Sequence, residues 1–238
     1  MPTQAIQAGG DDGHAGSRAL LAATVAVAIL YGFALVTLGT PPSASETGSQ
    51  LVVWLGEHSQ SVRWFVWAFT VATLPLAIMF ALLRRLLPPP HRDVFLIGAV
   101  TYLAATAVET WPWAGLALHV DQLEPKTVRA IVDVAIFYGP VLTGTTTTMI
   151  APVTLLALGG RAGLPRWLGV FGAIVFTEQA VETVTIFGSK GFIEPGGAMN
   201  LDLGGTLTYG WILAFGLWGG LRGRAQNPVV ERAALTIE

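Results

Sequence analysis

Two glutamates stand one helical turn apart in the otherwise apolar stretch "FTEQAVETVTIF", residues 176–187. Because Glu178 and Glu182 are four residues apart, a helix places both carboxyl groups on the same face. Two carboxylates held close together in a low dielectric cannot both ionise easily, so we expect at least one to stay protonated near neutral pH. A protonated carboxylic acid can donate a hydrogen bond or act as a general acid. The pair is therefore the first candidate for catalytic chemistry.

Two further acids lie in apolar stretches at overlapping depths. Glu109 falls in the outer half of the stretch 94–116, and Asp133 falls near the outer end of the stretch 129–151. A charged side chain at the centre of a bilayer costs about 2.5–3.5 kcal/mol on insertion scales. We therefore expect the four acids to be catalytic candidates that face a bundle interior or a wet cavity, with Arg129 as the nearest basic partner. For Glu109 and Asp133 the alternative is solvation at the membrane interface or hydrogen bonding between helices.

Aromatic side chains are expected at the same depth as these acids. We predict that a substrate-binding cavity is lined by five of them: Tyr102, Trp111, Trp113, Tyr138 and Tyr209. The faces of aromatic rings stabilise positive charge on a ligand or on a reaction intermediate. For the two tryptophans the alternative is an anchoring role at the level of the lipid headgroups.

The elements that must position these residues are predicted to be transmembrane helices. Of the 238 residues, 53% are hydrophobic and only 12% are charged, whereas soluble domains have about 25% charged residues. A helix that crosses a membrane needs about 20 predominantly apolar residues. Six stretches qualify, namely 19–39, 64–83, 94–116, 129–151, 167–187 and 203–221. The sequence thus predicts an all-α polytopic membrane bundle of about six transmembrane helices.

The basic residues predict how this bundle is oriented. One side of the predicted spans holds Arg18, Arg84, Arg85, Arg92, Arg161, Arg166, Arg222 and Arg224. The other side holds Arg63, Lys126, Arg129 and Lys190, mixed with acidic residues. Because basic residues concentrate in cytoplasmic loops, we expect both termini in the cytoplasm and a multi-pass protein of the bacterial inner (plasma) membrane. The expected domains are a disordered cytoplasmic tail at 1–17, one transmembrane domain at 18–223 and a cytoplasmic tail at 224–238.

Several classes of chemistry are not expected from this composition. The chain has no cysteine, so it has no disulfide, thiolate metal site or cysteine nucleophile. The four histidines, His14, His58, His91 and His119, form no metal-binding motif, and we predict no metal and no cofactor. A net charge of -2 gives no basic patch, which argues against nucleic acid as a partner. We expect membrane lipids and a small hydrophobic ligand as partners, while the sequence does not predict the oligomeric state.

The segment "GLPRWLGVFGAI", residues 163–174, resembles a recurring piece of small bacterial six-span membrane proteins of unknown function. In those proteins a cytoplasmic Leu-Pro-Arg-Trp-Leu-Gly turn leads into the fifth helix. The resemblance implies the same fold and topology and carries no activity or site residue. In size, helical character and buried acids the chain is also loosely similar to integral-membrane terpene cyclases, which protonate an isoprenoid. This second similarity is one of chemistry alone.

Taken together, these features favour a membrane protein with a buried acidic site in the outer half of the bundle. That site would bind a small hydrophobic or lipid/isoprenoid-like molecule and, in an enzyme, act on it with a protonated glutamate as acid. One alternative is a proton- or cation-coupled transporter, which a continuous polar path across residues 167–187 would favour. Another is an accessory subunit, which acids on the outside of the bundle would favour. A cavity closed toward the cytoplasm would favour the binding site.

Overall fold

A computed structural model describes residues 5–225 of the chain, with the side chains of residues 15–222. Within residues 5–225 the chain forms helices and loops and no β-strand. The α-helices are α1 (Ala5–Leu38), α2 (Gly48–Arg84), α3 (His91–Leu116), α4 (Pro125–Ile136), α5 (Tyr138–Leu158), α6 (Arg166–Glu182) and α7 (Thr206–Ala225). Three short 3-10 helices, η1 (Val120–Gln122), η2 (Thr183–Phe187) and η3 (Gly191–Ile193), and a π-helix, η4 (Met199–Gly205), lie between them. The predicted all-α bundle is confirmed.

Most of the predicted spans correspond to long apolar helices. Five segments are long and apolar enough to cross a membrane: Ala15–Leu38, Gly48–Arg84, His91–Leu116, Pro125–Leu158 and Arg166–Phe187. The sixth predicted span, 203–221, coincides with α7. Large apolar side chains also cover the outward faces of the helices, where Ile29, Leu74 and Leu155 are 65%, 68% and 65% exposed. Such faces are typical of helices that contact lipid.

The disordered tail predicted at residues 1–17 is described only in part. The structure assigns the chain from Ala5 onward to α1, and the disorder of the tail stays a prediction. Residues 1–4, and nearly all of the tail predicted at 224–238, lie outside the described residues.

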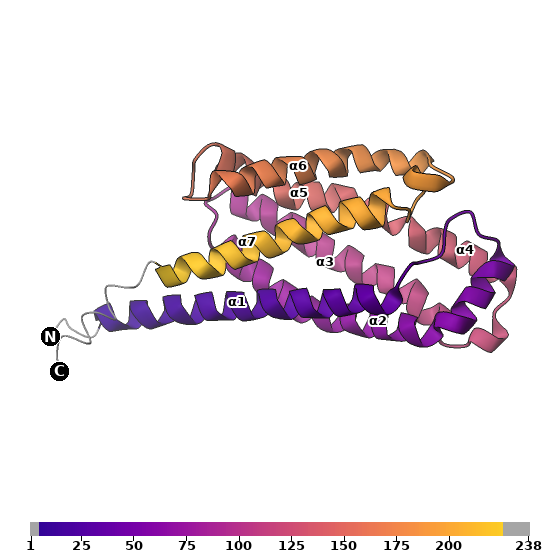
Figure 1. The fold of residues 1–238 in the computed structure, drawn as a ribbon. Helices are drawn as coiled ribbons and strands as arrows, with labels where there is room; N and C mark the ends of the chain where they lie inside the picture. The colour runs from indigo at the N-terminus through magenta and orange to yellow at the C-terminus, as the bar shows by residue number, and fades with distance from the viewer. Residues whose placement is uncertain (1–4, 226–238) are drawn as a thin grey trace.

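The start of α1 and the end of α7 lie at the same end of the bundle (Figure 1). This arginine-rich end also contains the loops 85–90 and 159–165. There, Arg222 of α7 donates hydrogen bonds to the carbonyl oxygens of Ala162 and Gly163, each at 3.1 Å. In the described residues, both ends of the chain thus lie at one end of the bundle, and their cytoplasmic location stays a prediction.

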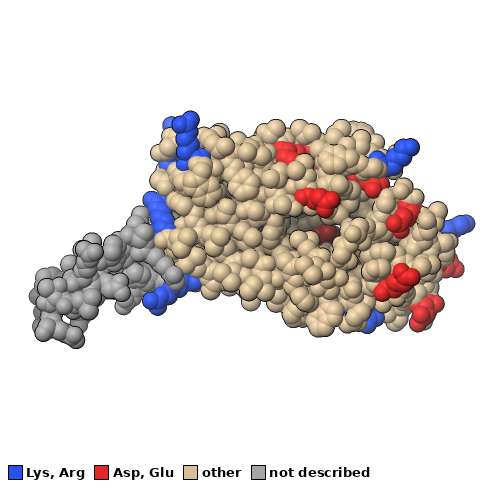
Figure 2. All heavy atoms as spheres, in the orientation of Figure 1, with Lys and Arg blue, Asp and Glu red and all other residues tan. Residues whose placement is uncertain are grey.

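The opposite end, which we call the loop-rich end, differs in charge and in backbone structure. Figure 2 shows that acidic side chains on this face gather toward it. α2 begins there, and Figure 1 shows its first turns at an angle to the rest of the helix. The predicted span 129–151 is divided there into α4 and α5. Pro140 lacks the N–H that would bond the carbonyl of Ile136, and α4 ends at Ile136.

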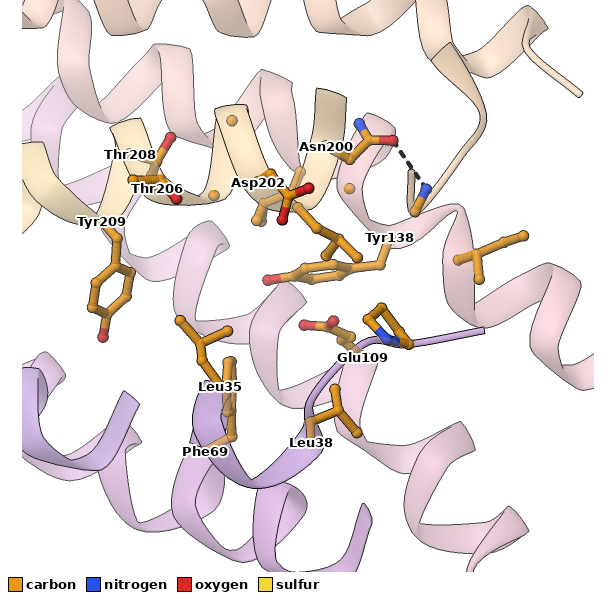
Figure 3. Close-up of a pocket in the computed structure, with 18 of the residues that line it drawn as sticks. Leu35, Leu38, Phe69, Glu109, Tyr138, Asn200, Asp202, Thr206, Thr208 and Tyr209 are labelled. Atoms are coloured by element: carbon orange, nitrogen blue, oxygen red, sulfur yellow. Dashed lines mark hydrogen bonds between the residues drawn. The ribbon is translucent and has the colours of Figure 1, made fainter. Parts of the chain in front are cut away.

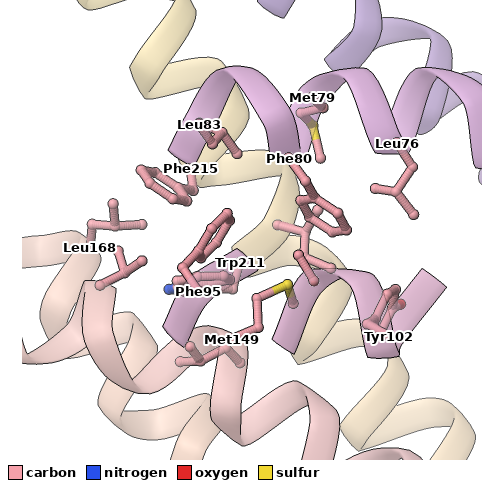
Figure 4. Packing of buried hydrophobic residues seen from close by; sticks show 14 of the residues in the cluster. Leu76, Met79, Phe80, Leu83, Phe95, Tyr102, Met149, Leu168, Trp211 and Phe215 are labelled. Carbon is pink, nitrogen blue, oxygen red and sulfur yellow. The ribbon is translucent and has the colours of Figure 1, made fainter. Parts of the chain in front are cut away.

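The helices pack side by side around one continuous interior. α1 packs against α2 and α7, α2 packs against α3, α3 against α5, and α5 against α6. The half of the bundle next to the arginine-rich end is filled by apolar side chains (Figure 4). The rings of Phe95 and Phe215 meet edge to face at 6.0 Å, and Trp211 lies 5.6 Å from Phe215. This half of the interior is therefore closely packed and mainly apolar.

Glycines let these helices approach closely. A Cβ on Gly98 of α3 would lie 2.7 Å from the Cα atom of Met149 in α5, a separation that real side chains do not tolerate. A Cβ on Gly216 of α7 would contact Thr24 of α1, and one on Gly220 would contact Leu21. The Gly216–Gly220 pair is thus a small-xxx-small contact made inside the chain.

Candidate functional site

A cavity of about 410 Å³ lies in the half of the bundle next to the loop-rich end. Ligand pockets commonly have volumes of about 300–1,000 Å³. All seven α-helices and η4 contribute to its lining. Figure 2 shows the surface hollowed where α1 and α7 diverge in Figure 1, with an acidic side chain visible inside the hollow. Leu35 of α1 and Leu201 of η4 line the cavity and are 59% and 43% exposed. Asp202 and Thr206, which also line it, are exposed too, so its mouth has both apolar and polar edges.

Three carboxylates border this cavity. They come from three different elements: Glu109 from α3, Glu182 from α6 and Asp202 from η4. Figure 3 shows Glu109 and Asp202 on opposite sides of the Tyr138 ring, and the Tyr138 hydroxyl is within hydrogen-bonding reach of Glu109. Among the described residues, those that line the cavity include no lysine, arginine or histidine. The cavity therefore combines acidic groups with no basic partner.

Two side-chain amides hold Glu182, which is only 2% exposed. Asn200 Nδ2 donates a hydrogen bond to Glu182 Oε1 at 2.5 Å, and Gln179 Nε2 donates one to Glu182 Oε2. Asn200 Oδ1 in turn accepts a hydrogen bond from the backbone N–H of Gly196 at 3.0 Å (Figure 3). Both oxygens of Glu182 are thus acceptors, and the carboxylate is fixed in place.

Glycine is required where η4 approaches α6. A Cβ on Gly204 would contact both Glu182 and Gln179. On the other side of Asn200, a Cβ on Gly139 of α5 would lie 3.1 Å from the Asn200 side chain. These two glycines give Asn200 and Glu182 the room to meet.

Glu178 lies behind Glu182 and does not line the cavity. It is 9% exposed, and its Oε2 atom accepts a hydrogen bond from Gln179 Nε2 at 3.0 Å. Its Oε1 atom is buried without a hydrogen-bond partner in the described part of the chain. Glu178 and Glu182 thus share one buried face of α6, joined through the Gln179 amide.

The structure does not bring Asp133 to the other acids. The buried face of α4 carries Val128, Val132, Ala135 and Ile136, whereas the Asp133 side chain is 50% exposed. It forms an ion pair with Arg129, whose other amino group donates a hydrogen bond to the carbonyl oxygen of Glu46 at 2.7 Å. The expectation that Asp133 faces the interior fails because α4 is a separate helix whose apolar face alone turns inward.

Most of the predicted aromatic residues line the cavity, with one exception. Tyr102, Trp113, Tyr138 and Tyr209 lie in its wall, but Trp111 does not and is 68% exposed. Residues two apart on a helix point about 200° apart at 3.6 residues per turn. Trp111 and Trp113 therefore cannot both face the cavity, and Trp111 is placed as an interfacial anchor would be.

The sequence analysis missed several lining residues. Tyr31 of α1 lies under Tyr209, with ring centroids 4.1 Å apart, and beside Phe69 at 4.4 Å. A single tyrosine in an apolar stretch gave no signal of a site. Asn200 and Asp202 were assigned to an outer loop, and nothing in their spacing indicated that the loop folds inward. Gln179 did have a signal, since it is a polar residue between two acids in a membrane span.

Two loops cross the bundle beside the cavity at its loop-rich end. Gly39, Pro41 and Pro42 of the α1–α2 loop line the cavity. In the same loop, Ser43 Oγ donates to the carboxylate of Glu194, with distances of 2.9 and 3.0 Å to its two oxygens. Glu194 lies in the α6–α7 segment and is 8% exposed. The two loops are thus tied to each other, and Arg129 ties the first of them to α4.

Among the side chains of residues 15–222, no group of three or more histidine, cysteine, aspartate or glutamate residues is arranged to hold a metal ion. The three carboxylates of the cavity are spread around its wall rather than gathered at one point.

Comparison of the chain with protein-family models, with curated proteins and with solved structures finds no match. The family resemblance of residues 163–174 therefore stays a prediction.

Proposed function

We propose that this chain is an integral membrane protein that binds a small hydrophobic or lipid/isoprenoid-like molecule in the cavity between α1 and α7. The observation that carries the proposal is the cavity itself, with its apolar and aromatic wall, its few polar groups and its mouth on the side of the bundle. A mostly apolar pocket with a small number of converging polar groups is typical of ligand sites. In the orientation that the arginines predict, the mouth faces the outer leaflet.

Two observations favour binding over the alternatives. Tyr31 and Tyr102, which line the cavity, also belong to the packed apolar cluster that fills the other half of the bundle. A transporter would need a polar path through that half of the bundle. The packing of Phe95, Phe215 and Leu168 favours instead a cavity that is closed toward the arginine-rich end. An accessory subunit would present its acids to a partner, whereas Glu178 and Glu182 are turned inward.

If the protein is an enzyme, Glu109 is the better candidate for the general acid. Both oxygens of Glu182 accept hydrogen bonds from amide groups, and hydrogen bonds of this kind stabilise a carboxylate relative to its protonated form. Glu109 faces the cavity beside Tyr138 and has no such amide partners among the described residues. Glu182 would then shape the site electrostatically, with Glu178 behind it.

Native mass spectrometry of gently extracted protein tests the proposal. The wild type is compared with Thr206→Trp, which places a large ring at the cavity wall from an exposed position at the start of α7. Glu57→Gln, an exposed position outside the cavity, is the control. We expect a defined extra mass on the wild type and on Glu57→Gln that Thr206→Trp lacks, and an organic extract identifies it. No retained mass on the wild type, or the same mass on Thr206→Trp, would contradict a ligand in this cavity.

A further inference from the structure

The charge of the cavity indicates what kind of ligand it takes. The three carboxylates of the cavity differ in burial and in partners. Glu182 is 2% exposed and has two amide donors. Glu109 is half-buried with only Tyr138 within reach, and Asp202 is exposed and has no hydrogen bond or ion pair with any described residue. With no basic side chain in the described lining, the groups that lack a partner are negative.

The aromatic wall stands next to these carboxylates. Tyr31, Tyr102, Tyr138 and Tyr209 all line the cavity, together with Trp113. Figure 3 shows the Tyr138 ring lying between the carboxyl groups of Glu109 and Asp202. Aromatic faces combined with carboxylates are the arrangement that proteins use to bind ammonium groups. Both features therefore point to the same ligand chemistry.

One hydroxyl group gives an independent sign of a polar ligand group. The Thr208 side chain lines the cavity and is 5% exposed, and its Oγ1 atom has no hydrogen-bond partner among the described residues. A buried hydroxyl without a partner is costly, and a ligand with a polar end would satisfy it.

The position of the mouth indicates the chemistry of the rest of the ligand, beyond its polar head group. The mouth lies between α1 and α7 on the side of the bundle, where the exposed apolar side chains of Leu35 and Leu201 lie beside the exposed polar residues Asp202 and Thr206. A polar head group inside the cavity therefore leaves an attached alkyl chain pointing sideways into the lipid. Resting on the proposed function, we infer that the cavity binds the ammonium head group of an amphiphile whose alkyl chain leaves between α1 and α7.

Binding of matched amphiphiles to the full chain, purified in a maltoside detergent with an uncharged head group, tests this inference. The probes are dodecyltrimethylammonium, dodecanol and dodecanoate, which share one chain length, and tetramethylammonium, which has no chain. We expect one dodecyltrimethylammonium per protein, bound at least about tenfold more tightly than dodecanol. Dodecanoate and tetramethylammonium should bind more weakly still.

Variants test whether the carboxylates cause the preference for the ammonium probe over dodecanol. Glu109→Gln and Asp202→Asn should each weaken binding of the ammonium probe about tenfold and leave dodecanol binding unchanged, which also shows that the cavity is intact. The matched control Glu57→Gln, with the same change of charge outside the cavity, should alter neither. If Glu57→Gln weakens ammonium binding as much, long-range charge rather than the site explains the preference, and the inference is overturned.

The remaining outcomes separate this inference from the proposed function. Equal binding of dodecyltrimethylammonium and dodecanol, lost in Thr206→Trp, would overturn the ammonium head group and leave a hydrophobic ligand site standing. Tetramethylammonium bound as tightly as its dodecyl analogue would overturn the alkyl chain and point to a soluble amine. Failure of every probe to bind the wild type would overturn both.

Discussion

At the scale of single residues, the side-chain amide of Gln179 joins the two acids Glu178 and Glu182. Gln179 Nε2 donates to Glu178 Oε2 and to Glu182 Oε2, and Gln179 is 4% exposed. In a low-dielectric interior, removing a donor leaves the acceptor with its full desolvation cost. Gln179 is therefore the residue on which the geometry of the pair depends.

Replacing this amide should destabilise the protein. Gln179→Leu keeps the approximate size of the side chain but leaves two buried carboxylate oxygens without their donor, at a cost of about 1–3 kcal/mol each. Thermal unfolding in detergent measures the effect, at roughly 2–4 °C per kcal/mol for a chain of this size. Thr177→Val, at an exposed neighbouring position on α6, should change the Tm little. An unchanged Tm for Gln179→Leu would show that the bridge contributes nothing.

The acids of the site could be predicted better than their partners. A spacing of four residues was enough to put Glu178 and Glu182 on one face, and the depth of Glu109 followed from the length of its span. Asn200, which fixes Glu182, is eighteen positions away along the chain. Its contact depends on how the segment after η2 folds back, and no periodic pattern encodes such a fold.

At the scale of elements, regular α-helix gives way to other backbone forms around the cavity. α6 continues as the 3-10 helix η2, α4 breaks from α5, and the π-helix η4 precedes α7. Irregular backbone is tolerated at membrane depth where it is buried in protein or lines a cavity, and π-helical turns are frequent at functional sites. The lengths of the apolar runs predicted the spans, but 129–151 was predicted as one continuous helix, and its break before Pro140 was not foreseen. The π-helix had no signal in the sequence.

The close contact between α3 and α5 gives a prediction at this scale. Gly98→Ala should lower the Tm, because its Cβ would be forced against the Met149 backbone, and overpacking costs about 1–3 kcal/mol. Gly32→Ala is the matched control, since a Cβ on Gly32 of α1 meets nothing within 4 Å. It should leave stability unchanged or raise it by up to about 1 kcal/mol. Equal Tm values for the two variants would contradict the packing described for α3 and α5.

At the scale of the whole molecule, charge divides the bundle into two ends, and this division predicts its orientation. Because the chain has no cysteine, single cysteines can report on each end. We expect an impermeant maleimide to label Gln122→Cys at the loop-rich end in intact bacterial cells whose outer membrane has been made permeable. Pro88→Cys at the arginine-rich end should react only after the inner membrane is opened. The reverse pattern would place the mouth of the cavity in the inner leaflet.

Hydrogen bonds from Ser43 to the Glu194 carboxylate and from Arg129 to the carbonyl oxygen of Glu46 connect the loops on the side of the cavity that would face water. No such hydrogen bond crosses the mouth between α1 and α7 among the described residues. A ligand would then enter from the plane of the membrane, and the quantity that governs occupancy is its mole fraction among the lipids rather than its concentration in water. Affinities measured for this site should therefore shift in proportion to the amount of lipid or detergent present, even when the total amount of ligand is held constant.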